Sequence, residues 1–417
     1  MNRGRRGCGK YQHNGPMDAA SAVGSLLSPR AGVDPYPAYA AIRAHGPVLP
    51  AGGAFFVTGY AAADEILRDS TMRAYDGALI DEQWSDWRAN RAVSLFADSM
   101  LRQNPPNHTR MRRLASGVFT ARRVSELRGV IEAQVDELLD GLAGPEVDLM
   151  TDLAYPLPIA VITALLGVPA QDRGMFRRLA EALTAVLEVR FSEEQANTAH
   201  VAALELEEYF AALVERRRRA PQGDLVTALA AAHDAGGDRL TGDELMGNLA
   251  LLLVAGFETT TNLLGNGVVL LLDHPVQAKR LATDPGLAPA YVEEVLRVDS
   301  PVQLTERFAG QDAEIAGVEI PTGSELIVLL GAANRDPDRF AEPERFVPDR
   351  PGNAPLSFGA GAHYCLGAPL ARLEAQVALP ALVRRFPDLE LTERPVRRDR
   401  LTLRGWAALP VTLGSVD

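Results

Sequence analysis

The chain has 417 residues, of which 47% are hydrophobic and 23% are charged, and its formal net charge is −12. These values are typical of a globular protein with a sizeable core, and the even composition along the chain favours one large domain. The acidic balance excludes nucleic acid as a partner, because binding phosphates needs a dominantly basic surface.

The first segment, residues 1–16, is polar and basic, and we expect it to be a disordered leader before a single domain over residues 17–417. No apolar stretch follows its basic residues, so it resembles neither a signal peptide nor a membrane anchor. Met17 is an alternative start. We therefore expect a cytoplasmic protein that does not associate with a membrane.

A small sheet begins the folded part of the chain. Residues 48–51 and 54–59 flank Gly52-Gly53, a pair suited to the positive φ angles of a tight hairpin. From residue 61 to about 290, Leu and Ala recur at spacings of three and four, which predicts helices.

Two segments within this helical region are candidates for a substrate lid. Residues 75–104 have no helical period and contain Trp84, Trp87 and Phe96, and a loop of this length is usually functional. In the other segment, residues 174–209, two helical stretches meet around residues 191–192. Ordinary packing explains either segment equally well.

The longest predicted helix covers residues 241–273. Thr241 and Glu244 have the spacing of a capping box, and Pro275 follows the end. The helix would be roughly 45 Å long, enough to cross the molecule. Its middle contains Gly256, Glu258 and Thr259, residue types that are poor choices for a buried helix interior.

This middle segment suggests a site rather than a structural element. Thr259 can donate a hydrogen bond to the carbonyl of Ala255, four residues earlier, and Gly256 would leave a gap beside it that could admit water or dioxygen. The alternative is a bend in the helix with a solvated glutamate.

The remaining elements are short. We predict a helix at residues 292–298, strands at 313–315, 318–320 and 324–330, and a closing helix at 366–385. The fold class that follows is mainly α with small β-sheets (α+β), one large helical domain with a minor β-rich region.

The cysteine loop carries the strongest signal for chemistry. Cys365 stands in the run Phe-Gly-Ala-Gly-Ala-His-Tyr-Cys-Leu-Gly of residues 358–367, just before a helix. The glycines let the backbone approach a flat ligand closely. N–H groups at a helix start should lower the pKa of the thiol and favour metal ligation. A nucleotide-binding G-x-G-x-x-G fails because Tyr364 occupies the third glycine position.

Residues 358–367 closely resemble the haem-binding signature of the cytochrome P450 family, and further motifs follow the family's order along nearly the whole chain. The resemblance implies a P450 fold around haem b, with Cys365 as the proximal iron ligand. Phe358 would pack beside the sulfur, His363 would donate to a haem propionate, and Gly367 and Gly256 would lie against the cofactor. Thiolate ligation favours cleavage of the O–O bond.

The resemblance also assigns roles in the long helix. Glu258 and Thr259 match the family's acid-alcohol pair, in which the acid relays protons and the alcohol holds dioxygen and a water. The family's E-x-x-R motif matches Glu294 and Arg297, which with Arg345 would form a buried network that locks the cysteine loop.

Three further residues match propionate donors of the family: His108, Arg112 and Arg307. Together with His363 they would present four donors to two carboxylates, an arrangement of strong, charge-assisted hydrogen bonds. Taken without the resemblance, residues 105–113 would be a solvated helix start.

The function implied is that of a soluble bacterial-type haem-thiolate monooxygenase, which oxidises a small hydrophobic substrate, such as a polyketide, terpenoid or steroid-like secondary metabolite, with O₂. The chain has no room for a flavin reductase, so we expect a ferredoxin and an NAD(P)H-dependent ferredoxin reductase as partners, docking near Arg110, Arg113 and Arg372. The alternatives are a peroxygenase driven by H₂O₂ and a haem-binding protein without turnover. The substrate-contact candidates are mostly apolar: Trp84, Trp87, Phe96, Val254, Ala255, Val302 and Leu304.

Overall fold

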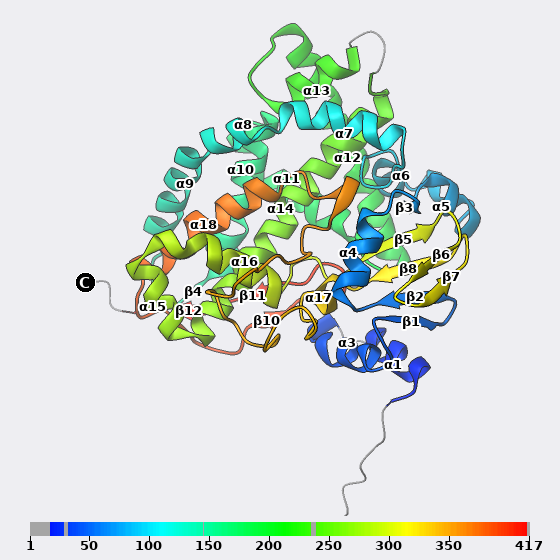
Figure 1. Cartoon of the computed structure of the whole chain (residues 1–417). Helices are drawn as coiled ribbons and strands as arrows, with labels where there is room; N and C mark the ends of the chain where they lie inside the picture. Colours follow the sequence, from blue (N-terminus) through cyan, green and yellow to red (C-terminus); the bar gives the residue numbers. More distant parts are fainter. Residues whose placement is uncertain (1–16, 29–31, 145, 235–238, 415–417) are drawn as a thin grey trace, which may run out of the picture.

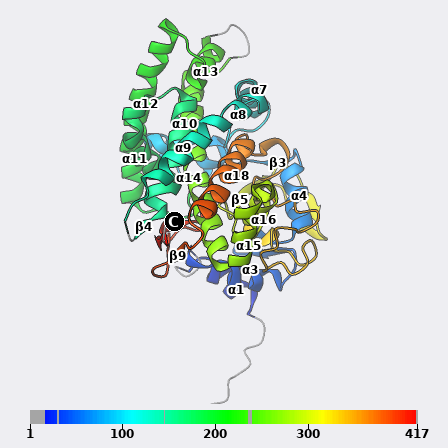
Figure 2. The same ribbon diagram turned by 90° about the vertical axis from the view of Figure 1, so that its left-hand side faces the viewer.

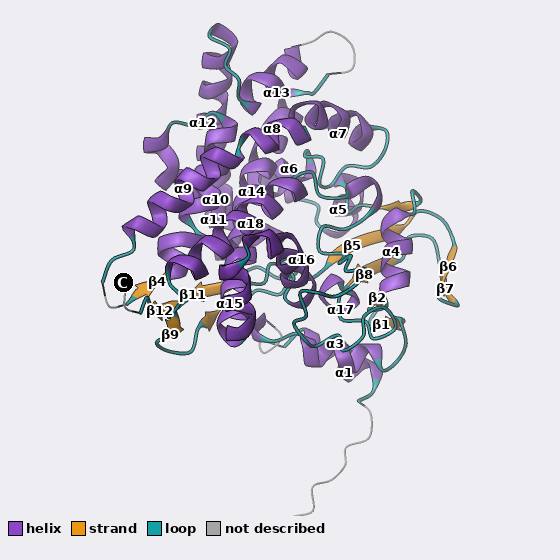
Figure 3. Cartoon of the chain, turned by 60° about the vertical axis from the view of Figure 1, so that its left-hand side comes forward, coloured by secondary structure: helices purple, strands orange, loops and turns teal. Residues whose placement is uncertain are grey.

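The computed structural model describes residues 17–28, 32–144, 146–234 and 239–414, and the predicted leader at residues 1–16 lies outside this range. Helices form most of the molecule, and the strands lie at its margin (Figure 3). The larger sheet stands on one side of the helices (Figure 1). The predicted class, mainly α with small β-sheets, is confirmed.

The helices of the described chain are α1 (Ala19–Leu26), α3 (Tyr36–Arg43), α4 (Tyr60–Arg68), α5 (Gly77–Gln83), α6 (Arg91–Ala97), α7 (Asn107–Val118), α8 (Ala121–Glu126), α9 (Arg128–Gly141), α10 (Pro156–Leu166), α11 (Arg173–Leu183), α12 (Glu193–Arg219), α13 (Leu225–Asp234), α14 (Gly242–Asp273), α15 (Pro275–Thr283), α16 (Ala288–Val298), α17 (Leu330–Ala333) and α18 (Ala368–Arg385).

Helix α14 is the centre of the fold. The predicted capping box is present: the Glu244 N–H donates to Thr241 Oγ1 over 3.2 Å, and the Thr241 N–H donates to Glu244 Oε2 over 2.8 Å. Its 32 residues give a length of about 48 Å. It passes between the other helices (Figure 2) and packs against α6, α10, α11, α16 and α18. A helix covered on so many sides is apolar around most of its circumference.

The main sheet has the strand order β1-β2-β8-β5-β3. Its strands are β1 (Val48–Ala51), β2 (Ala54–Val57), β3 (Met72–Arg73), β5 (Thr305–Ala309) and β8 (Glu325–Val328). The predicted hairpin is confirmed, with φ angles of +60° at Gly52 and +89° at Gly53. Strand β8 pairs parallel to β2 and antiparallel to β5, with Arg307 opposite Leu326.

Short strand pairs complete the β structure: β4 (Val147–Asp148), β6 (Ala313–Ile315), β7 (Val318–Ile320), β9 (Glu390–Leu391), β10 (Val396–Arg397), β11 (Trp406–Ala408) and β12 (Pro410–Thr412). The pair β6 and β7 was predicted, whereas β5 and the strands after α18 were not. The predicted strand at residues 324–330 stops at Val328, and Leu330 begins α17.

The prediction that residues 75–104 are irregular is wrong. They form α5, a 3₁₀ turn at Trp87–Ala89 and α6. The helices are too short to show a period, but their caps are visible in the sequence: Asp76 accepts from the Leu79 N–H, and Asn90 accepts from the Ala92 and Val93 N–H groups.

The largest hydrophobic core surrounds α14, and smaller cores lie beneath the main sheet and under α1 and α3. Among the helices of residues 17–28, 32–144, 146–234 and 239–414, none has the length and apolar character needed to cross a membrane.

Candidate active site

The cysteine loop leads into α18 and packs against α4. Gly359 and Gly361 have φ angles of +69° and +66°, which favour glycine. A side chain at Gly361 would start 2.2 Å from the Leu67 carbonyl oxygen of α4, so only glycine allows this contact. The Cys365 N–H donates to the Phe358 carbonyl over 2.9 Å. These contacts fix the position of the cysteine at the start of α18.

Cys365 is a partly exposed free thiol. Burial raises the pKa of Cys365, although the N–H groups of Gly367 and Ala368 and the Arg112 guanidinium act to lower it. The expectation of a lowered pKa is therefore wrong for the protein without a metal, because the amides do not outweigh the loss of water. A bound metal cation would supply the missing positive charge.

Four basic side chains from separate elements meet beside this loop. His108 and Arg112 come from α7, Arg307 from β5 and His363 from the loop itself. The His108 and His363 ring centroids lie 3.9 Å apart. The Arg112 guanidinium donates to the Tyr364 carbonyl over 2.6 Å. We call His108, Arg112, Arg307 and His363 the basic cluster.

The basic cluster has a surplus of positive charge. Burial, together with the positive charges of His108, Arg307 and Arg112, lowers the pKa of His363 to about 3, and burial lowers the pKa of Arg307 to about 10. Within the described chain, neither Arg112 nor Arg307 forms an ion pair with an acidic side chain. The cluster thus suits a ligand with more than one negative charge, and the two propionates of haem fit this donor set.

The middle of α14 contains solvent-accessible residues. Ala255 is exposed and Thr259 is partly exposed, although most of the helix is buried. Thr259 Oγ1 donates to the Ala255 carbonyl over 2.6 Å, as predicted. The expected gap at Gly256 is not there: a side chain at this position would start 2.8 Å from Ile162 Cδ1, so Gly256 allows α10 to approach α14.

Glu258 is buried, with 0% of its side chain exposed. Its Oε1 accepts from Arg398, and from Arg400 over 3.2 Å. Both arginines belong to the chain after α18, where the sequence analysis identified no site residue. The alternative of a solvated glutamate is excluded.

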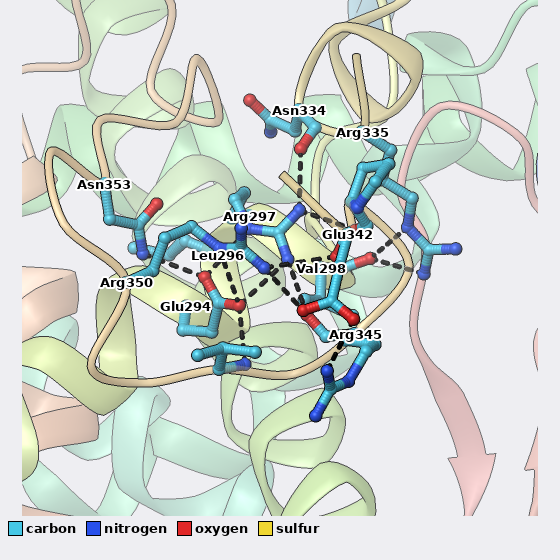
Figure 4. A network of polar contacts seen from close by, with 12 residues as sticks. Glu294, Leu296, Arg297, Val298, Asn334, Arg335, Glu342, Arg345, Arg350 and Asn353 are labelled. Atoms are coloured by element: carbon cyan, nitrogen blue, oxygen red, sulfur yellow. Dashed lines mark hydrogen bonds and ion pairs between the residues drawn. The ribbon is translucent and has the colours of Figure 1, made fainter. Parts of the chain in front are cut away.

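The Glu294–Arg297 pair in α16 is completely buried, and Figure 4 shows its surroundings. Two parallel hydrogen bonds of 2.8 Å join the side chains. The prediction for Arg345 is wrong as regards its side chain, which forms an exposed pair with Glu342; only the Arg345 carbonyl accepts from Arg297, over 2.8 Å. Arg350 donates to Glu294 in its place, over 3.3 Å.

This network reaches the cysteine loop through residues that the sequence analysis missed. Arg297 donates to the Asn334 carbonyl over 3.0 Å, and the Asn334 side chain accepts from the Leu356 N–H and donates to Ser357. Ser357 Oγ donates to the Leu296 carbonyl of α16 over 2.7 Å. The segment before Phe358 is thereby hydrogen-bonded to α16.

The predicted substrate contacts divide by burial. Ala255 is exposed and Val302 partly exposed. Trp84 lies on the surface, with 37% of the residue exposed. The other candidates have side chains that pack within the cores and present at most 4% of their surface: Trp87, Phe96, Val254 and Leu304.

A contact missed from sequence ties the α11–α12 connection to the chain near Val302. The Glu188 carboxylate accepts the N–H groups of Leu401, Thr402 and Leu403 over 3.1, 2.9 and 3.1 Å. Leu403 in turn forms a β-bridge with Val302.

Comparison with known proteins gives consistent results. The family model described as Cytochrome P450 matches residues 286–406. The chain is 41% identical to the Vitamin D(3) 25-hydroxylase of Pseudonocardia autotrophica over 91% of this chain and 94% of that protein. It is also 41% identical to the Cytochrome P450 monooxygenase PikC of Streptomyces venezuelae, over 91% of each. The crystal structure of ligand-free CYP164A2 from Mycobacterium smegmatis superposes with a TM-score of 0.86 at 40% identity, covering 94% of this chain and 99% of that one.

Proposed function

Because the chain belongs to the cytochrome P450 family of haem-thiolate monooxygenases, we propose that Cys365 ligates the iron of haem b and that the basic cluster binds its propionates. The observation that carries this assignment is the basic cluster, in which Arg112 and Arg307 have no acidic partner among the described residues, next to the only cysteine of the folded chain described. When bound, haem supplies the activation of O₂. We further propose that residues 17–417 fold as one domain, with residues 1–16 as a leader.

The residues of α14 account for proton handling. Thr259 donates its hydroxyl proton to the Ala255 carbonyl, so its oxygen keeps lone pairs that can accept a hydrogen bond from a water. Glu258 Oε2 has no hydrogen-bond partner in the part of the chain that the structure describes, and the oxygen is free to accept a proton. Together these groups can pass protons from the interior side of α14 toward its open surface at Ala255 and Thr259.

The substrate class we propose is a small apolar secondary metabolite, of polyketide, terpenoid or steroid-like chemistry, and hydroxylation is the expected reaction. Relatives support this class by their names, since they include a Vitamin D(3) 25-hydroxylase and a 6-deoxyerythronolide B hydroxylase. Within the chain, apolar Ala255 and Val302 are the accessible candidates for contact with such a substrate.

Electrons come from a ferredoxin and its NAD(P)H-dependent reductase in our proposal, with docking beside the cysteine loop. Arg372 pairs there with Glu293 over 3.1 Å and Arg110 with Glu244 over 2.8 Å, so the surface is less basic than the sequence suggested. Replacing both Arg113 and Arg372 by Glu should raise the KM for ferredoxin. Unchanged kinetics would remove this face as the docking site.

A turnover experiment separates the three candidate activities. The purified haem protein is supplied with ferredoxin, reductase and NAD(P)H in one reaction and with H₂O₂ alone in another, with a panel of macrolides, terpenoids and steroids as substrates. A monooxygenase oxidises a substrate with NAD(P)H, and Thr259→Ala should lower the yield of product per NAD(P)H. Product from H₂O₂ alone, unaffected by Thr259→Ala, would indicate a peroxygenase, and no product under either condition would indicate a haem-binding protein.

A further inference from the structure

The chain after α18 carries Arg397, Arg398, Arg400 and Arg404, which we call the arginine segment. Its members bind two different buried acids. Arg397 and Arg404 donate to Asp299, over 2.6 and 2.7 Å. Arg398 and Arg400 donate to Glu258 of α14. The segment therefore connects the proposed proton-handling acid to a part of the chain that no motif identified.

Glu258 needs these partners to remain ionised inside the protein. A carboxylate with 0% exposure is stable as an ion only when it is paired, because desolvation otherwise favours the neutral form. Both arginines bind the same oxygen, Oε1, and leave Oε2 without a hydrogen-bond partner among the residues described. One oxygen is held by the two arginines, while the other remains available as a hydrogen-bond acceptor.

The arginines also lead from Glu258 to the solvent. The side chains of Arg398 and Arg400 are 13% and 24% exposed, so both side chains are in partial contact with solvent. Arg398 is fixed in this position because it also donates to the Tyr155 hydroxyl and lies 5.3 Å from the centre of the Tyr155 ring. Tyr155 is itself 4% exposed and has the Arg177 guanidinium 4.2 Å from its ring centre.

We propose that Arg398 and Arg400 are positioning residues for oxygen activation, which keep Glu258 ionised within the fold and link it to solvent at the arginine segment, from which it is reprotonated. This inference rests on the proposed role of Glu258 in proton supply. Arg398 and Arg400 touch neither substrate nor cofactor in this account, and act through Glu258.

The test is made without substrate and measures how much of the consumed O₂ is reduced to H₂O₂ and how much to water. In the slow consumption of NAD(P)H that ferredoxin and reductase support, NAD(P)H + H⁺ + O₂ gives NAD(P)⁺ + H₂O₂, whereas two NAD(P)H + 2 H⁺ + O₂ give two NAD(P)⁺ + 2 H₂O. Water formation requires the larger proton supply per O₂. The measured quantities are the NAD(P)H rate, the H₂O₂ released per NAD(P)H and the solvent isotope effect on the rate.

Arg398→Gln and Arg400→Gln should slow NAD(P)H consumption by about tenfold, since proton relays contribute at least this much. Both should raise the H₂O₂ yield and the solvent isotope effect, and Glu258→Gln should do the same. Arg398→Lys, which keeps the charge, should restore part of the rate. Arg397→Gln is the matched control, because this arginine lies in the same segment but pairs with Asp299. Its H₂O₂ yield per NAD(P)H should equal that of the wild type.

Infrared spectroscopy gives a readout that does not depend on turnover. In Arg398→Gln/Arg400→Gln the unpaired Glu258 should take up a proton, and a protonated carboxyl band should appear that is lost again when Glu258→Gln is added. Should the double variant fold poorly, Arg400→Gln alone is suitable, because Arg400 is the more exposed of the two.

The outcomes distinguish this inference from the proposal it rests on. If Glu258→Gln has wild-type H₂O₂ yield and isotope effect, the proton role of Glu258 is wrong and the inference with it. Suppose that Glu258→Gln raises the H₂O₂ yield and the isotope effect. If the Arg398 and Arg400 variants then behave as wild type, the inference alone is overturned. The same holds if their NAD(P)H rate falls only as much as that of Arg397→Gln.

Discussion

Buried acidic side chains in this fold are mostly paired with arginine, and Glu374 of α18 is different. It is 1% exposed, and its Oε2 has no hydrogen-bond partner within the described chain. Burial raises the pKa of Glu374 well above its ordinary value. Since the folded-state pKa is the higher one, the folded protein holds a proton that the unfolded chain releases, and stability falls as pH rises above the unfolded pKa.

Glu374→Gln should therefore stabilise the protein at neutral and alkaline pH and change it little below the ordinary pKa of a glutamate. Each kcal/mol gained would raise the Tm by about 2–4 °C or less in a protein of this size. Thermal unfolding of wild type and variant across pH 4.5 to about 8.5 measures the difference in Tm between them. A difference in Tm that stays constant or becomes smaller as pH rises contradicts the assignment.

Contacts between residues that are close in the sequence were predicted best. The back-bond from Thr259 to Ala255 and the capping box of α14 need only residues within one helical turn, and both are present. The partners of Glu258 could not be foreseen, because Arg398 lies 140 residues away and no local pattern distinguishes it from a surface arginine.

At the scale of elements, the loop that follows α17 is held by α16. The Glu294–Arg297 pair bonds to carbonyl and N–H groups of this loop, including the Val347 N–H over 2.8 Å. Because both side chains are 0% exposed, removal of either charge leaves the other buried without compensation.

Glu294→Gln should lower the free energy of unfolding by about 3–5 kcal/mol and reduce haem incorporation. Arg345→Gln is the control: its side chain is 65% exposed and, within the described chain, pairs only with Glu342 at the surface, so the change should stay within about 0.5 kcal/mol. Chemical denaturation and the ratio of haem to protein absorbance provide the two measurements. Equal effects of the two substitutions would refute the arrangement seen in Figure 4.

Elements with a long hydrophobic period were predicted well, and short ones were not. Helix α18 begins two residues after the predicted start and ends at Arg385 as expected. In contrast, β10 and β11 pair over only a few residues with a register shift between Val396 and Arg397, which leaves no alternation to detect. Strand β5 was missed because it is fixed by pairing with β8, which lies outside its local sequence window.

At the scale of the whole molecule, the basic cluster joins α7, the main sheet and the cysteine loop. Its positive groups repel one another until an anion binds, so a dianionic cofactor should stabilise the assembled fold beyond its apolar contacts. The separation of these elements in sequence explains why their convergence was an expectation from family resemblance and not a deduction from local pattern.

Removal of haem should therefore lower the Tm. Arg112→Gln should reduce the difference in Tm between the haem-bound and the haem-free protein. The substitution removes charge repulsion from the haem-free form and a propionate contact from the haem-bound form. Arg113→Gln, a change at an exposed position in the same helix, should leave the difference unchanged. Scanning calorimetry of both forms decides this. An unaltered difference in Arg112→Gln would exclude it from propionate binding.

The most direct test of the account is the carbon monoxide difference spectrum of the dithionite-reduced protein, in wild type and in Cys365→Ala. We predict a red-shifted Soret band, as thiolate ligation gives, that is lost in the variant while the far-ultraviolet spectrum still shows a helical fold. An imidazole-type band in the wild type, or a band unchanged by the substitution, would contradict the assignment of Cys365 as the iron ligand.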